Sequence, residues 1–235
     1  ASCMSVYVSG SDLHATYIEE NPIPPHWRVA KAWKNGTSTA LSNGTRDAFV
    51  KSVFVSGGNV YAAGYEHNGV NYVPTVWKNG VASTLTDGTR NGYAESIFVS
   101  GSDVYVAGSV YNGINADMPT LWKNGVATTL AGSSSGGGAR SVFVAGSDVY
   151  VAGFDQTATT LTAKIWKNGI PIVLSNGTNS SLATSIYIYG SDVYVAGFIK
   201  NGTNDVATFW KNGVPTALAN GVNETNAYSI FVSNN

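Results

Sequence analysis

The sequence predicts an all-β protein, a five-bladed β-propeller built from four-stranded antiparallel blades. Three observations predict this fold. The tetrapeptide Trp-Lys-Asn-Gly recurs every 44 or 45 residues, starting at Trp33, Trp77, Trp122, Trp166 and Trp210. Each repeat contains four short runs rich in β-branched and aromatic residues, which favour strands. No segment combines helical periodicity with helix caps.

The repeat over residues 96–140 illustrates the expected strands. They are expected at 96–99, 103–107, 120–123 and 126–130. Asn124-Gly125 is a strong hairpin signal, because both residues of that turn must accept a positive φ. Gly108 is expected to end the second strand, and the Gly-rich stretch 133–138 is expected to be a flexible connector. The whole chain 1–235 is then a single propeller domain with repeats at about 5–51, 52–95, 96–140, 141–184 and 185–228.

One surplus strand of the inner type remains at the C-terminus. The motif that opens each repeat recurs once more at Ser229–Val232, after the last complete repeat. Either 5–8 or 229–232 could supply the inner strand of the first blade, and the sequence leaves both open. Because an ordered strand with an unpaired backbone is costly, we expect the surplus strand to pair with another edge. A homo-oligomer formed by strand exchange is one such outcome.

The composition excludes several functional classes. Of the 235 residues only 11% are charged, and the formal net charge is −1, so no basic surface for nucleic acid is expected. No apolar stretch is long enough to form a transmembrane segment. A single cysteine excludes an internal disulfide framework. Since His14, His26 and His67 lack metal-ligand spacing, neither a metal nor a cofactor is expected.

The repeats also carry a resemblance. The stretch Ser-Asp-Val-Tyr-Val-Ala-Gly recurs intact at 102–108, 147–153 and 191–197, each followed by Trp-Lys-Asn-Gly. Over its whole length the chain resembles bacterial secreted and lipoprotein β-propellers with DVYVAG…WKNG repeats, a resemblance that implies the fold but no activity. In blade number and repeat length it is similar to tachylectin-2-type lectins, and that likeness is architectural.

A ligand is expected where the repeats differ from one another. In a propeller the loops between second and third strands share one face with the blade connectors, and here those loops vary, at about 17–30, 65–73, 109–118, 154–162 and 198–206. Loops on a rigid scaffold commonly carry binding residues. The candidate ligand-binding residues are His26, Trp27, Lys51, Tyr65, Tyr72, Glu95, Tyr111 and Arg140.

Two of these groups have structural alternatives. His26 and Trp27 lie in a proline-rich loop that could instead be a lid packed onto the first blade. Lys51, Glu95 and Arg140 precede successive inner strands and are expected at the mouth of the central channel. They predict a polar pocket for an anionic or hydroxylated ligand, and the alternative is a structural ion-pair cluster.

The leading functional prediction is a non-catalytic extracellular module that binds carbohydrate through aromatic stacking and neutral hydrogen bonds. A self-assembling surface protein that uses the surplus strand is the alternative, and a glycoside hydrolase is third. Hydrolysis needs two facing carboxylates, and the sequence offers no evident pair, so no catalytic residue is assigned. The composition suits a secreted or cell-surface protein. Ala1-Ser2-Cys3 resembles the end of a lipoprotein signal, which would make Cys3 a lipid anchor.

Overall fold

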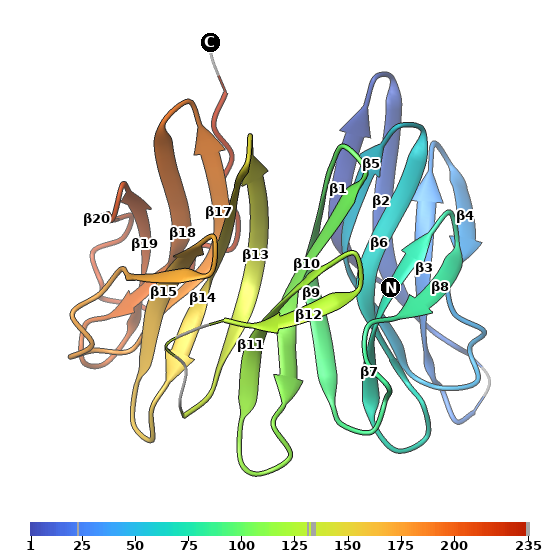
Figure 1. The fold of residues 1–235 in the computed structure, drawn as a ribbon, viewed down its shortest axis with the longest axis horizontal. Helices are drawn as coiled ribbons and strands as arrows, with labels where there is room; N and C mark the ends of the chain where they lie inside the picture. Colours follow the sequence, from blue (N-terminus) through green and yellow to red (C-terminus); the bar gives the residue numbers. More distant parts are fainter. Residues whose placement is uncertain (23, 131, 133–134, 234–235) are drawn as a thin grey trace. The chain divides into compact units, whose positions relative to one another are not determined.

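A computed structural model describes residues 1–22, 24–130, 132 and 135–233. In this part of the chain 20 strands form five separate four-stranded antiparallel sheets, each in simple sequential order (Figure 1). These sheets are the blades of a five-bladed β-propeller, as predicted. None of the described segments is a helix long and apolar enough to cross a membrane.

Each blade consists of four strands that follow one another in the sequence. The inner strands are β1 (Ser2–Ser9), β5 (Ala48–Ser56), β9 (Gly92–Ser100), β13 (Gly137–Ala145) and β17 (Ser181–Tyr189). The second strands are β2 (Asp12–Glu20), β6 (Asn59–His67), β10 (Asp103–Tyr111), β14 (Asp148–Gln156) and β18 (Asp192–Lys200). The third strands are β3 (Arg28–Lys34), β7 (Tyr72–Lys78), β11 (Asp117–Lys123), β15 (Leu161–Lys167) and β19 (Asp205–Lys211). The outer strands are β4 (Thr37–Ala40), β8 (Val81–Thr84), β12 (Val126–Thr129), β16 (Ile170–Val173) and β20 (Val214–Ala217).

The chain divides into two compact units. Unit 1 comprises residues 1–113 and 122–127, and unit 2 comprises residues 114–121 and 128–235. Within unit 1, β1 packs against β5 and β5 against β9; within unit 2, β13 packs against β17. Both faces of the blade 2 sheet are thus covered by neighbouring blades. This burial explains why its first two strands are almost entirely apolar. The single-domain organisation stays a prediction.

The first two strands of each blade are longer than predicted. The inner strand β9 starts at Gly92 rather than Ser96, and β10 continues through Gly108 to Tyr111. A β-bulge interrupts their pairing between Ala107 and Gly108. A Cβ atom on Gly108 would lie 1.9 Å from the carbonyl oxygen of Tyr93. The prediction that Gly108 ends the strand is therefore wrong: this glycine permits close approach of two backbones at the bulge.

The predicted connector 133–138 is only partly within the described residues. Residues 133 and 134 lie outside them, whereas Gly137 and Gly138 are the first residues of β13.

The Trp-Lys-Asn-Gly repeat ties the outer hairpin of a blade to the turn between its first two strands. Trp122 is fully buried, and the Lys123 Nζ lies 2.7 Å from Oδ2 of Asp103. Asn124 has a φ of 51°, and its side-chain amide donates to Asp103 Oδ1 at 2.8 Å. The hydrogen bonds from Lys123 and Asn124 lower the pKa of Asp103. The repeated aspartates therefore hold turns, and the described residues contain no group of acidic, histidine and cysteine side chains suited to a metal.

The C-terminal segment has the position of an inner strand without being one. β1 pairs with β2, so residues 5–8 supply the inner strand of blade 1. Among the described residues, 226–233 form no strand, yet they lie beside β17, where the Phe231 ring contacts the Tyr187 ring. The Ile230 N–H donates to Ser185 Oγ at 3.3 Å, just as the Ile186 N–H of β17 donates to Ser141 Oγ at 3.2 Å. No strand among the described residues pairs with this segment, and it stays irregular.

Candidate ligand-binding site

Half-buried rings gather at the variable-loop end of blade 2, within unit 1. We call this group the aromatic cluster; it consists of Phe49, Tyr65, His67, Tyr72 and Tyr93. The Phe49 and Tyr65 rings stack, with centroids 5.0 Å apart and planes 30° apart. Tyr93 meets Tyr65 edge-on at 5.0 Å, and His67 meets Tyr72 edge-on at the same distance. These separations are those of favourable aromatic pairs.

The ends of neighbouring strands bring these rings together. Phe49 is directly opposite Tyr65 in the pairing of β5 with β6. His67 is directly opposite Tyr72 in the pairing of β6 with β7. Tyr93, the second residue of β9, comes from the next inner strand, which packs against β5. Cross-strand pairs of this kind stabilise the sheet and also define a surface at its end.

Two cations flank the aromatic cluster. Lys51 lies at the bulge of β5, and its Nζ is 5.7 Å from the Tyr65 ring centroid. Arg28 begins β3 of blade 1, and its guanidinium carbon is 5.2 Å from the Phe49 ring centroid. Asp47 fixes Arg28 by accepting its backbone N–H at 2.8 Å. Cation–π contacts of this kind hold the rings in place.

A polar cavity of about 160 Å³ adjoins the aromatic cluster. It is lined by Ser42, Asn43, Thr45, Arg46, Asp47, Ala48, Glu66 and His67. His67 belongs to both the cavity lining and the aromatic cluster. A surface of aromatic rings thus continues into a small recess with neutral and charged hydrogen-bonding groups.

Glu66 is the unusual group in this cavity. In two other blades the equivalent carboxylate pairs with a lysine, Glu19 with Lys31 and Asp155 with Lys164. In blade 2 the position of that lysine is occupied by Thr75, which donates to the Val73 carbonyl instead. The Glu66 side chain has no hydrogen-bond or ion-pair partner in the part of the chain described, and burial raises its pKa. Glu66 is therefore a carboxyl group that is left available to a ligand.

The structure brings together three of the predicted residues and leaves others apart. Tyr65 and Tyr72 belong to the aromatic cluster, and Lys51 flanks it, as the preceding contacts show. Lys51 lies in the middle of β5, however, and not ahead of an inner strand as predicted. The same correction applies to Glu95 and Arg140, which lie at the bulges of β9 and β13.

Glu95 and Tyr111 belong to blade 3. Glu95 is half-buried, and Tyr111 ends β10, where its N–H donates to the Asn91 carbonyl at 2.8 Å. Arg140 is part of unit 2, where its guanidinium carbon lies 5.4 Å from the Phe154 ring centroid. The aromatic cluster is therefore built without Tyr111 or Arg140.

His26 and Trp27 lie in the loop between β2 and β3. His26 has a φ of 60°, and its Nδ1 is 3.0 Å from the Asn21 carbonyl oxygen. The Trp27 carbonyl accepts the Asn21 N–H at 2.9 Å, so both residues hold the loop. Within the described residues no ring contact joins Trp27 to the aromatic cluster; the loop reaches the cluster through the next residue, Arg28.

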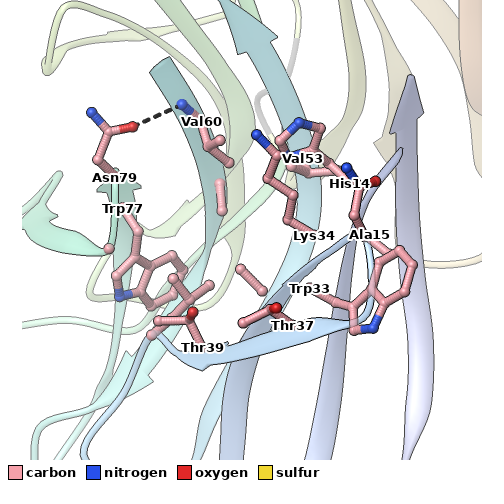
Figure 2. A pocket seen from close by; sticks show the side chains of 15 residues that line it. His14, Ala15, Trp33, Lys34, Thr37, Thr39, Val53, Val60, Trp77 and Asn79 are labelled. Carbon is pink, nitrogen blue, oxygen red and sulfur yellow. Dashed lines mark hydrogen bonds between the residues drawn. The ribbon is translucent and has the colours of Figure 1, made fainter. Parts of the chain in front are cut away.

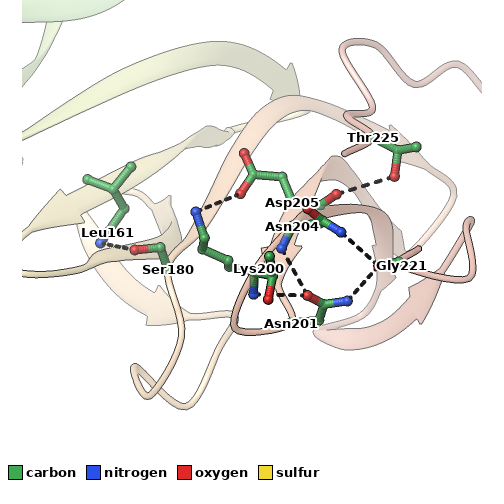
Figure 3. A network of polar contacts seen from close by, with 9 residues as sticks. Leu161, Ser180, Lys200, Asn201, Asn204, Asp205, Gly221 and Thr225 are labelled. Carbon is green, nitrogen blue, oxygen red and sulfur yellow. Dashed lines mark hydrogen bonds and ion pairs between the residues drawn. The ribbon is translucent and has the colours of Figure 1, made fainter. Parts of the chain in front are cut away.

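The asparagines of the variable loops stabilise the loops themselves. In blade 5 the Asn201 Oδ1 accepts the Asn204 N–H at 3.0 Å, and both side-chain amides donate to the Gly221 carbonyl (Figure 3). Asn68 and Asn71 repeat this arrangement in blade 2. The loop backbone therefore already uses these amides.

The comparison of these two loops shows what is special about blade 2. In blade 5 the strand ends are joined by an ion pair, with Lys200 Nζ 3.8 Å from Asp205 Oδ1 (Figure 3). At the equivalent positions blade 2 has His67 and Tyr72, which form a ring contact. The ends of the second and third strands are therefore joined by an ion pair in blade 5 and by an aromatic contact in blade 2.

Comparisons with known proteins support the fold and no more. No protein-family model matches the sequence, and no curated protein matches it. Among solved structures, the chain is similar to a puromycin-hydrolysing peptidase from Mycobacterium tuberculosis, with a TM-score of 0.59 and 12% identity over 92% of this chain. The match covers 38% of the peptidase. An exo-1,5-α-L-arabinanase from a bovine ruminal metagenomic library gives a TM-score of 0.48 and 7% identity over 92% of this chain and 95% of the arabinanase. At these identities the likeness to the peptidase concerns the fold alone.

Proposed function

We propose that the protein is a non-catalytic, extracellular carbohydrate-binding module whose site is the aromatic cluster together with the polar cavity beside it. The observation that carries this proposal is the continuity of the two through His67. Sugars have apolar C–H faces that stack on aromatic rings, and hydroxyl groups that need directional partners. The half-buried rings supply the first, and Glu66 with Asp47 supplies acceptors for the second.

The electrostatics of the site favour a neutral ligand. Arg28 and Asp47 already neutralise one another, with Nη1 and Oδ2 3.6 Å apart. Lys51 points to the Tyr65 ring, and burial raises the pKa of Glu66. Arg46 and Glu66 add one charged group of each sign to the cavity lining, so charges of both signs alternate with neutral groups, which suits a hydroxylated neutral molecule.

Replacing Tyr72 by alanine is expected to weaken carbohydrate binding roughly tenfold or more, because it removes a ring from the centre of the site. Glu66→Gln keeps the shape of the cavity and should weaken binding less. Glycans are first identified on an array, and their affinities are then measured by titration calorimetry. Tyr189→Ala is the matched control, since Tyr189 is an exposed tyrosine at the turn end of blade 5.

Two results would contradict the proposal. An array without any binding glycan removes it, and so does equal affinity of the wild type and the Tyr72 variant. Release of new reducing ends from a bound glycan, abolished by Glu66→Gln, would instead identify a glycoside hydrolase that uses Glu66 and Asp47.

Self-assembly is a second candidate, favoured by the C-terminal segment. Residues 226–233 occupy the position of an inner strand but pair with no strand among those described, and Phe231 is 73% exposed. A backbone edge of this kind can accept a strand from another molecule. Light scattering should then show a mass that grows with concentration and falls to that of a monomer when 229–235 are deleted. An unchanged mass after deletion would remove this candidate.

A further inference from the structure

A second cavity lies between blades 1 and 2, at the opposite end of β6 from the aromatic cluster. Its volume is about 490 Å³, within the range of small-molecule sites. Its lining comes from β2, β3 and β4 of blade 1 and from β5, β6 and β7 of blade 2. Figure 2 shows Trp77 and Asn79 on one side of this pocket and His14 and Lys34 on the other. Residues of two Lys-Asn-Gly turns also line it, among them Asn35 and Gly80.

The cavity arises because three residues at this interface are smaller than the residues at the equivalent positions of other blades. His14 stands where the other blades have tyrosine, Tyr61, Tyr105, Tyr150 and Tyr194. Ala32 stands where they have Val76, Leu121, Ile165 and Phe209. Ala62 stands where the later blades have Val106, Val151 and Val195. In the equivalent interface of unit 2, Tyr150, Ile165 and Val195 are all buried in a single apolar core.

A buried hydrogen-bond donor is left unused at the same interface. The Trp210 and Trp122 indole N–H groups donate to the Leu174 and Leu85 carbonyls at 3.0 and 3.1 Å. Trp77 holds the equivalent position and is 1% exposed, but its Nε1 has no partner among the described residues. A buried donor without a partner costs free energy, so this interface is less well satisfied than the equivalent ones.

A second unsatisfied group lies on β2, outside the lining of the cavity. Thr16 lies two residues from His14 on the same face of β2, is fully buried, and its Oγ1 also lacks a partner among the described residues. The other lining groups near Trp77 are mostly apolar, among them Leu41 and Val53. The interface therefore has an empty volume with mostly apolar walls, and two buried polar atoms near it lack partners among the described residues.

We propose that this cavity binds a neutral, mainly apolar small molecule. The apolar body of the ligand replaces the side chains that fill the equivalent interface in unit 2. Lys34 does not select an anion, because its Nζ lies 2.6 Å from Asp12 Oδ2. This site is independent of the carbohydrate site at the other end of blade 2.

The test uses Prodan, a neutral naphthyl ketone whose emission shifts to the blue in an apolar site. The wild-type protein should bind it saturably with one site per chain. The double substitution Ala32→Ile with Ala62→Val introduces the residue types of Ile165 and Val195 and should weaken binding roughly tenfold or more. His14→Tyr introduces the tyrosine found at this position in every other blade and should also weaken Prodan binding roughly tenfold or more. It fills the cavity by a different substitution, so the test stands even if the double variant folds poorly.

Naphthalene, which has an apolar aromatic body and no hydrogen-bond acceptor, should compete with Prodan for the same site, because the apolar walls supply the binding. Val126→Ala, at an exposed outer-strand residue, is the control for binding to surface apolar groups. Absence of saturable binding, or undiminished binding by both filled variants, would overturn the proposal.

Discussion

Replacing Trp210 by alanine is expected to lower the free energy of unfolding by about 4 kcal/mol, as for other large-to-small changes in a core. Trp210 is fully buried in the apolar core of unit 2, together with Ile186 and Leu174. Its indole N–H donates to the Leu174 carbonyl at 3.0 Å. The substitution removes a large apolar surface and leaves that carbonyl without its partner. Urea unfolding followed by circular dichroism measures the loss.

Trp33→Ala is the matched control for this prediction. Trp33 has the same place in the repeat but is only half-buried. Its removal should cost about 1–2 kcal/mol, because less apolar area returns to water. Equal losses for Trp33→Ala and Trp210→Ala would show that the tryptophan of the motif does not stabilise the fold through burial between blades.

Gly108→Ala is expected to destabilise the protein by roughly 3 kcal/mol or more, although it adds only one methyl group. The new Cβ would lie 1.9 Å from the Tyr93 carbonyl oxygen and 3.0 Å from the Cα of Ala94. Both contacts are with backbone, so no side chain can turn away to relieve them. The two strands must separate at the bulge, in the innermost strand pair of the blade.

Gly101→Ala provides the comparison for the Gly108 variant. Gly101 lies in the exposed turn between β9 and β10 with a φ of 59°, and a Cβ there would have no neighbour within 4 Å. Its cost is the strain of a left-handed alanine alone, about 1 kcal/mol. If the Gly108 variant unfolds at the same urea concentration as the Gly101 variant, the close backbone approach at the bulge is not a constraint on the fold.

The fold could be predicted because its signals are local and repeated. The Asn-Gly pair at 124–125 fixes a hairpin, and five copies of the pattern leave little freedom in how the strands follow one another. The strand lengths could not be predicted in the same way. A glycine in a strand and a glycine at its end have the same sequence signature, so Gly108 was assigned to the wrong role. Its function depends on the distance to Tyr93, a residue of another strand.

The site could be predicted only in part, for a related reason. Tyr65 and Tyr72 were found because they flank a variable loop. Phe49 and Tyr93 were missed because they lie before the expected inner strands, in what the sequence suggested were connectors. Alignment of the repeats contains the missing signal: the positions of Phe49 and Tyr93 hold Gly138 and Leu182 in the later repeats. The aromatic residues are thus concentrated in blades 2 and 3.

Glu66 illustrates a signal that lies in a pair of positions rather than in one residue. A glutamate in a strand is unremarkable, and so is Thr75. Only the comparison with Glu19–Lys31 and Asp155–Lys164 shows that blade 2 has kept the carboxylate and lost its cation. The register between the second and third strands has to be known before the two positions can be compared.

The central claim is that carbohydrate binds at the variable-loop end of blade 2. An NMR titration of isotopically labelled protein with the tightest-binding glycan tests it most directly. The account predicts that the largest shift changes occur in Phe49, Tyr65, Glu66, His67 and Tyr72. Saturable changes centred instead on the Lys-Asn-Gly turns, or on the cavity around Trp77, would contradict the assignment of the carbohydrate site.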